Sequence, residues 1–240
     1  MPGTDVEAVA DAGADGRALF RLLSWFSPNY PIGAFSCSHG LESAVDAGIV
    51  SDPASLETWI RDVTRRGVGR VETVLLAEAW RAADAGDFPA LHAVADLAAA
   101  WRPTAELAVE GDTQGDAFLA VAEAAWPSPS LFTFTTGRGD RPTPHPVAVG
   151  VVAAAHRIPL PPTATAFLFG FATGLVSVGV RLGIIGQTGG QRVIAALEPE
   201  IAATAAVALA TPLDEAGAAT PVVDWCSMRH ETQYTRLFRS

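Results

Sequence analysis

The sequence predicts an all-α protein: a single irregular bundle of about eight to ten helices around one buried apolar helix at about residues 163–180. The first observation is an uncharged run of 17 residues, Ala164–Val180. A helix that is apolar on every side must be buried on every side. The second is that apolar residues recur at helical spacing through most of the chain. The third is that no segment combines the composition of a strand with a sequence partner.

The uncharged run also fits a second interpretation, a membrane-spanning helix. Its length lies at the lower end of the roughly 17–25 residues that a span needs. Its composition leans to Ala, Gly, Thr and Ser, and the spacing of Gly170 and Gly174 lets another helix approach closely. These features favour the central helix of a soluble bundle, and a membrane span stays as the alternative.

The composition excludes several classes of protein. The chain has 240 residues, 49% of them hydrophobic, and a net charge of −10, so it is a poor candidate for binding nucleic acid. All 16 basic residues are Arg. The absence of Lys excludes a P-loop, a Schiff base and a lysine general base. Two cysteines, Cys37 and Cys226, do not indicate a disulfide framework.

The first residues differ from the rest. Residues 1–16 are acidic and Gly-rich, lack the basic start and apolar run of a signal peptide, and are predicted to be disordered. Residues 17–240 are predicted to form one all-helical domain, including an interaction tail at 222–240. With the low cysteine content, these features predict a cytoplasmic protein.

The first half of the domain consists of helical segments separated by Gly and Pro. The first segment ends before Pro28, because the residue before a proline avoids the helical region. Ser51 or Asp52 is the expected cap of a long segment with Pro53 in its first turn, and Thr104 is the expected cap of a later one. The predicted segments are Ala18–Phe26, His39–Ala47, Ser55–Ala85 with a break at Gly67 or Gly69, Ala90–Ala100 and Ala105–Ala125.

The second half begins with irregular structure. Leu131–Thr136 has the composition of a strand but no partner, so we predict a loop. Residues 137–146 are predicted to be a Pro-rich linker whose Arg-Gly-Asp tripeptide arises by chance. The remaining predictions are a helix at Val147–His156, a proline break at Ile158–Pro162, the central helix, a helix at Gln191–Ala210 capped by Thr188, a loop at Thr211–Pro221 and a short final helix.

Motifs for catalysis or metal binding are weak. Gly186–Gly190 resembles a phosphate-cradling loop, but without Lys or a preceding strand a structural turn is favoured over an anion site. Glu42 is the carboxylate of most interest, and a structural ion pair is its favoured role. No run supplies three or four metal ligands at a familiar spacing. The weak metal candidates are Cys37, His39, Cys226 and His230.

The last residues alternate apolar and basic side chains. Met228, Tyr234, Leu237 and Phe238 are interleaved with arginines, and Tyr, Arg and Met are enriched in protein interface cores. Such a segment either docks on its own domain or is kept for a partner. Composition alone does not decide between the two.

Three stretches together resemble one family. They are PIGAFSCSHGLESAV (Pro31–Val45), VRLGIIGQTGGQRVIAAL (Val180–Leu197) and SMRHETQYTRLFRS (Ser227–Ser240). From about Leu22 onward the chain closely resembles the family of the urease accessory protein UreF. The last two stretches are the specific ones, and the three occur in the family's order.

The resemblance implies an all-α, homodimeric maturation factor that is not an enzyme. UreF-like proteins bind UreD, also called UreH, recruit the GTPase UreG, and so support GTP-dependent nickel insertion into apo-urease. For this chain the resemblance implies no resident cofactor, nickel in transit and GTP on the partner GTPase. It implies neither a nucleic-acid nor a membrane partner.

The resemblance also implies site residues. Tyr234 and Arg236 match positions tied to the dimer and to GTPase recruitment, and Phe35 matches an aromatic position near the same groove. Arg236 is expected to order the tail rather than act as a finger at the nucleotide. The expected structural signature loop comprises Gly186, Gln187, Gly190, Gln191 and Arg192. The expected partner-binding residues are Phe35, Met228, Arg229, His230, Glu231, Tyr234, Arg236 and Leu237.

Two points stay open. Family members often carry Ser-His-Ser after the PIG-x-aromatic turn, whereas this chain has Ser-Cys-Ser followed by His39, which leaves the metal role of Cys37 and His39 undecided. The alternative function is a small helical metal-dependent hydrolase that uses Cys226, His230 and Glu231. Stoichiometric metal in the purified chain would favour that alternative.

Overall fold

The computed structural model describes the backbone of residues 4–240 and the side chains from Asp15 onward. Within this part of the chain the protein is all-α and has no strand, which confirms the predicted fold class. The helices are α1 (Thr4–Trp25), α2 (Leu41–Asp46), α3 (Pro53–Arg66), α4 (Val68–Asp84), α5 (Phe88–Ala100), α6 (Ala105–Ala125), α7 (Pro129–Arg138), α8 (His145–Ala155), α9 (Leu160–Arg181), α10 (Gln187–Ala210) and α11 (Pro221–His230), with short 3-10 turns η1 (Ala34–Ser36) and η2 (Leu213–Glu215).

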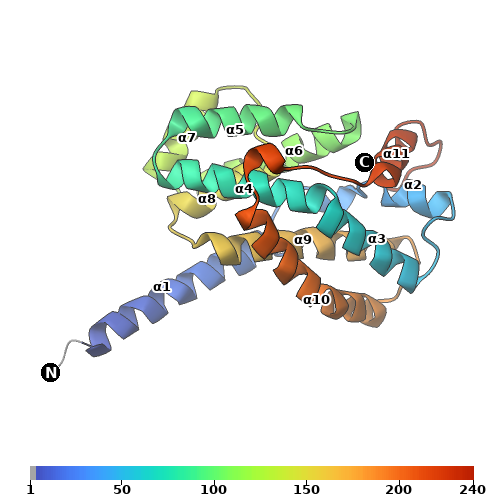
Figure 1. Cartoon of the computed structure of the whole chain (residues 1–240), viewed down its shortest axis with the longest axis horizontal. Helices are drawn as coiled ribbons and strands as arrows, with labels where there is room; N and C mark the ends of the chain where they lie inside the picture. Colours follow the sequence, from blue (N-terminus) through green and yellow to red (C-terminus); the bar gives the residue numbers. More distant parts are fainter. Residues whose placement is uncertain (1–3) are drawn as a thin grey trace.

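The helices are arranged around the α4–α8 pair (Figure 1). Helices α5, α6 and α7 cover one side of this pair, and α3, α9 and α10 lie on the other. Helices α2 and α11 pack together at one end of the bundle, and α1 projects from the opposite end. The two ends of the described chain therefore lie far apart.

Local sequence signals fix several helix ends. The Asp52 carboxylate accepts a hydrogen bond from the Ser55 amide at 2.8 Å, and Pro53 occupies the first helical position of α3. Thr104 accepts from the Leu107 amide at 3.2 Å and caps α6. Gly67 separates α3 from α4. These caps and this break are where the sequence predicts them.

Close helix packing at the centre depends on glycines, which have no side chain to keep the backbones apart. A Cβ atom on Gly150 of α8 would lie 2.5 Å from the Leu76 carbonyl oxygen of α4. A Cβ on Gly115 of α6 would lie 1.8 Å from the Thr143 carbonyl oxygen. Both distances are far below van der Waals contact, so any side chain there would push backbone from backbone.

Helix α9 is only half covered, which corrects the expectation that 163–180 is buried on every side. Leu168 and Ala172 are fully buried, but Phe169 is 44% exposed, and Gly174 and Ser177 also reach the surface. The uncharged run predicts burial because solvent offers no partner to an apolar face. The chain by itself supplies neighbours for one face only.

Two helices have the length and composition of a membrane span. They are α9 and α10, and 50% and 33% of their most apolar windows are buried in the bundle. The two helices pack against each other, and both also contact α3 and α4. These properties are shared by core helices of soluble proteins, so they are weak support for a span.

The segment predicted to be a loop at Leu131–Thr136 is helical, within α7. Pro129 begins the helix, and Leu131 and Phe134 are both fully buried at helical spacing. Tertiary packing therefore outweighs the preference of the Phe and Thr residues of this segment for strands. The same helix buries Arg138 of the chance Arg-Gly-Asp tripeptide against Asp96 at 2.5 Å.

Three helix starts differ from prediction by more than two residues. α10 begins at Gln187, with Gly186 and not Thr188 at the cap position. α9 begins at Leu160, because prolines are tolerated in a first turn and do not break it. α1 begins at Thr4, so a segment expected to be disordered has a helical backbone, in line with its alanine content. Residues 1–3 lie outside the described residues, and the boundary near residue 16 stays a prediction.

Candidate functional site

The C-terminal tail, residues 231–240, folds back along the turn that precedes α2. The Arg239 amide donates to the Ser36 carbonyl at 2.7 Å. The Ser38 amide and hydroxyl donate to the Ser240 carbonyl at 2.6 and 2.5 Å. Segments about two hundred residues apart in sequence are thus joined backbone to backbone.

Glu42 of α2 anchors this tail. Its carboxylate is buried and accepts from the Leu237 amide at 2.6 Å and the Phe238 amide at 3.0 Å. It also lies 2.9 Å from His230 Nε2. A buried carboxylate is stable only when such donors surround it, so the structural role expected for Glu42 fits its surroundings.

His230 lies between two carboxylates. Its Nε2 faces Glu42, and its Nδ1 lies 2.8 Å from Glu106 Oε2 of α6. The side chain is fully buried. Each ring nitrogen therefore has a carboxylate oxygen within hydrogen-bond distance. This contact ties α2, α6 and α11 together through one residue.

Arg236 completes the link to α6. Its Nη1 donates to Glu106 Oε1 at 2.8 Å, with a longer contact of 3.5 Å to the His230 carbonyl. The guanidinium is therefore engaged within the chain, in agreement with the tail-ordering role that the sequence favours for it. A finger role would require Glu106 to release it.

Glu110 holds the end of the tail. The Ser240 hydroxyl donates to Glu110 Oε2 at 2.7 Å, and His39 Nδ1 lies 3.5 Å from Oε1. Burial tends to raise the pKa of the Glu110 carboxyl. Contact with His39, the bond from Ser240 and the charge of Arg102 outweigh burial and lower that pKa below its ordinary value.

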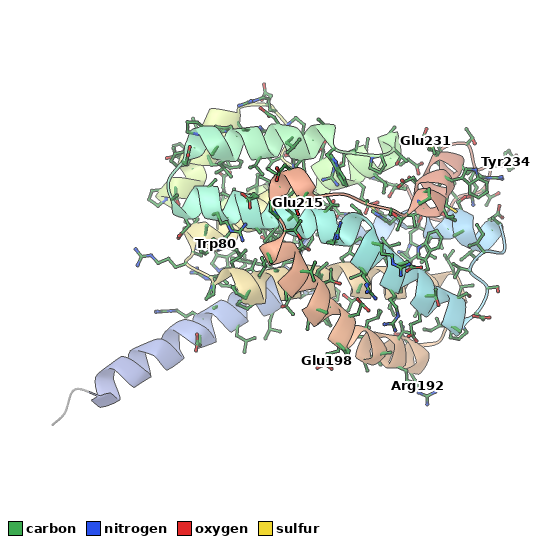
Figure 2. The ribbon with its side chains drawn as sticks, viewed as in Figure 1. Trp80, Arg192, Glu198, Glu215, Glu231 and Tyr234 are labelled. Carbon is green, nitrogen blue, oxygen red and sulfur yellow. The ribbon has the colours of Figure 1, made fainter. Side chains whose placement is uncertain are left out.

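Apolar side chains of the tail and of its neighbours point outward, although the backbone of the tail is held by the contacts above. Tyr234 is completely exposed, and Figure 2 shows it pointing away from the bundle beside α11. Phe35 is 77% exposed, and Met228 and Leu237 are about half exposed. Trp225 is also exposed and stacks under the Arg229 guanidinium at 4.9 Å. We call these five side chains the tail face.

Arg181, at the end of α9, connects Phe35 to the tail. Its guanidinium donates to the Phe35 carbonyl and lies 4.1 Å from the centre of the Phe238 ring. Phe238 is buried. The structure therefore brings Phe35 next to the tail, although 146 residues separate it from Arg181.

The signature loop divides into a packed and an exposed part. Gly190 is buried, and a Cβ there would lie 3.0 Å from Val176 Cγ1 of α9. Gln187, Gln191 and Arg192 are exposed. Among the described residues these three side chains make no hydrogen bond or ion pair, and Figure 2 shows Arg192 pointing away from α10. The structural role predicted for this loop therefore fits Gly190, and it fits the exposed residues beside it less well.

The four weak metal candidates do not come together. Cys37 and His39 line a cavity near the tail, whereas Cys226 and His230 are buried in α11. Both His230 nitrogens are engaged by carboxylates, so neither is free for a metal. Glu231 is exposed. No group of three or more His, Cys, Asp or Glu side chains in the described part of the chain could hold a metal ion.

Sequence reasoning missed Glu106, Glu110, Arg181 and Trp225. The carboxylates stand among 26 acidic residues, and nothing local distinguishes them. Trp225 could have been found, because it lies one helical turn before Arg229 in the same short helix.

Comparison with known proteins identifies the family of this chain. The UreF family model matches residues 50–198, more than half of the chain. The chain belongs to the UreF family. A urease accessory protein UreF from Rhodopseudomonas palustris (strain HaA2) is 49% identical over 225 residues, which cover 94% of each chain. The UreF of strain BisA53 is 48% identical over 99% of this chain and 98% of its own, and that of Granulibacter bethesdensis is 48% identical over 93% and 94%.

Proposed function

We propose that this UreF-family chain is a non-catalytic scaffold of urease maturation. It binds UreD/UreH, recruits the GTPase UreG and supports GTP-dependent nickel insertion into apo-urease. Nickel is cargo in transit and GTP belongs to the partner, so the chain itself carries no resident cofactor. The scaffold acts in the cytoplasm, without nucleic-acid or membrane partners.

The observation that carries the proposal is the fully exposed Tyr234 on a backbone held by buried charges. Tyr and Trp side chains dominate interface energetics when a partner buries them, and Met is enriched in interface cores. Ordering a flexible segment on binding costs free energy, and a segment that is already fixed avoids most of that cost. The tail face offers such side chains in a fixed arrangement, which suits it for GTPase recruitment.

The uncovered face of α9 supports the homodimer in the proposal. A single chain covers one side of this apolar helix and leaves Phe169, Gly174 and Ser177 at the surface. An uncovered face of an apolar helix is a place where chains associate. A second copy of the chain would cover it, with the small residues allowing close approach.

Deletion and complementation test this function. In cells that lack this chain, urease is expected to be made but to hold little nickel, measured as metal per urease active site after purification. The wild-type chain should restore nickel, and a Met228→Ala/Leu237→Ala variant should restore less. Normal urease maturation without the chain, or hydrolysis of a substrate by the isolated chain, contradicts the proposal.

A further inference from the structure

A cavity of about 370 Å³ lies between the end of α1, the turn at Pro31–Gly33, α6 and α9. One part of its wall is aromatic and includes Trp25, Phe167 and Phe171. The other part carries His39, Arg102 and His145. Small-molecule sites combine an apolar wall with a few convergent polar groups, and their volumes start near 300 Å³.

Arg102 is the strongest polar group in the cavity. Its side chain is only 5% exposed, and its Nη1 pairs with Glu72 of α4. Nε and Nη2 find no hydrogen-bond partner among the described residues. These two nitrogens form the side edge of the guanidinium, which matches both oxygens of a carboxylate. Leaving them unpaired in a buried site costs free energy.

The guanidinium is held in a fixed position. It lies against the α6 backbone, where a Cβ on Gly111 would come within 2.7 Å of Nη2. Glu72 fixes it from the other side. These contacts fix the position of the guanidinium, while Nε and Nη2 stay unsatisfied and covered, so a ligand reaches this edge only when the cavity wall beside it shifts.

Two histidines, His39 and His145, also line this cavity. His39 is 94% buried with a left-handed backbone (φ 55°), and neither of its ring nitrogens is hydrogen-bonded to a described residue. His145 Nε2 is likewise unpartnered. Burial, helped by the charge of Arg102, lowers the pKa of His145 to about 4, which keeps this ring neutral at neutral pH. A buried His39 with a left-handed backbone, whose Nδ1 has only the 3.5 Å contact with Glu110, is typical of a functional position.

The charges limit the ligand. Glu72 balances Arg102, and Glu110 also lines the cavity. A second negative charge on a ligand would therefore lie close to Glu110 without a further cation to offset it. The surroundings favour a ligand with one negative charge and an apolar body.

We propose that this cavity binds a small organic monocarboxylate, its carboxylate on the Nε–Nη2 edge of Arg102 and its apolar body against Phe167 and Phe171. Nothing in the UreF assignment requires such a ligand. The proposal can fail while the scaffold function stands, because binding is measured on the chain alone.

The test is a calorimetric titration of the full chain with benzoate, with its neutral analogue benzamide and with phosphate. Benzoate should bind saturably and at least about ten-fold more tightly than benzamide, the difference that charged hydrogen bonds supply. Phosphate should bind more weakly than benzoate. Equal binding of benzoate and benzamide, or no saturable benzoate binding at millimolar concentration, overturns the proposal and leaves a cavity filled by water.

Variants locate the site. Arg102→Gln should weaken benzoate binding at least about ten-fold, whereas Arg61→Gln, which removes a paired surface arginine of α3, should not. Because Arg102→Gln also removes a buried ion pair and can unfold the chain, Phe171→Ala serves as a second variant. It should weaken benzoate more than acetate. Unchanged benzoate affinity in a folded Arg102→Gln or Phe171→Ala protein contradicts the placement.

Discussion

The centre of the bundle and its α2–α11 end are built on opposite principles. At α4, α6 and α8, apolar side chains and glycines bring backbones into contact around a large buried apolar cluster. At the other end, carboxylates of α2 and α6 hold His230, Arg236 and the backbone of the tail. The first arrangement stabilises the fold, and the second fixes a short segment whose apolar side chains face solvent.

The largest effect is expected from Gly115→Ala. The new methyl group would overlap the Thr143 carbonyl, and neither backbone segment can move without disturbing α6 or α8. We expect a loss of at least about 3 kcal/mol in the free energy of unfolding, measured by urea denaturation. Gly16→Ala, in helix α1, is the matched control, because no described residue has an atom within 4 Å of its Cβ position. Equal stability of the two variants would contradict the close-packing account.

Glu42→Gln should release the tail and leave the bundle folded. Removing one partner of a buried charge pair costs about 3 kcal/mol, and two backbone amides lose a charged acceptor. Hydrogen exchange at Leu237 and Phe238 should accelerate strongly, while amides of α4 and α8 stay protected. Glu231→Gln, an exposed neighbour of the tail, is the control. Unchanged protection at Leu237 would show that Glu42 does not anchor the tail.

His145 predicts a pH dependence of stability. Its pKa is lowered to about 4 in the folded chain, so between that value and its ordinary 6.5 the unfolded chain binds the additional proton. Stability should therefore fall as the pH falls, by about 2 kcal/mol at pH 5 for this residue. The lowered pKa of Glu110 acts in the same direction, since its contribution is lost as that carboxylate is protonated. His145→Leu should flatten the curve above pH 5, and an unchanged slope refutes the assignment.

Arg192→Ala should have the smallest effect on stability, within about 0.5 kcal/mol. Its side chain is exposed and makes no ion pair with a described residue. Gly190→Ala, two residues earlier, should cost more because its Cβ would press on Val176. Thermal denaturation of the two variants separates the packed from the exposed part of the signature loop. The reverse order would show that Arg192 has a structural contact.

The parts of the fold that were predicted from sequence rest on local signals. Asp52, Thr104 and Gly67 act within a few residues of their own positions, so the sequence reveals them. Leu131–Thr136 was missed because its helix depends on burial of Leu131 and Phe134 and not on propensity. The tail network joins residues from 124 to about 200 positions apart, and no local sequence pattern indicates such contacts.

The central claim is that the ordered tail presents Tyr234 to the GTPase. The most direct measurement is recovery of UreG with the purified chain and UreD in the presence of GTP. It compares the wild type, Tyr234→Ala and Phe132→Ala, whose ring is 68% exposed on α7. All three should fold with similar stability. The account predicts that only Tyr234→Ala loses UreG, and full recovery of UreG by Tyr234→Ala would contradict it.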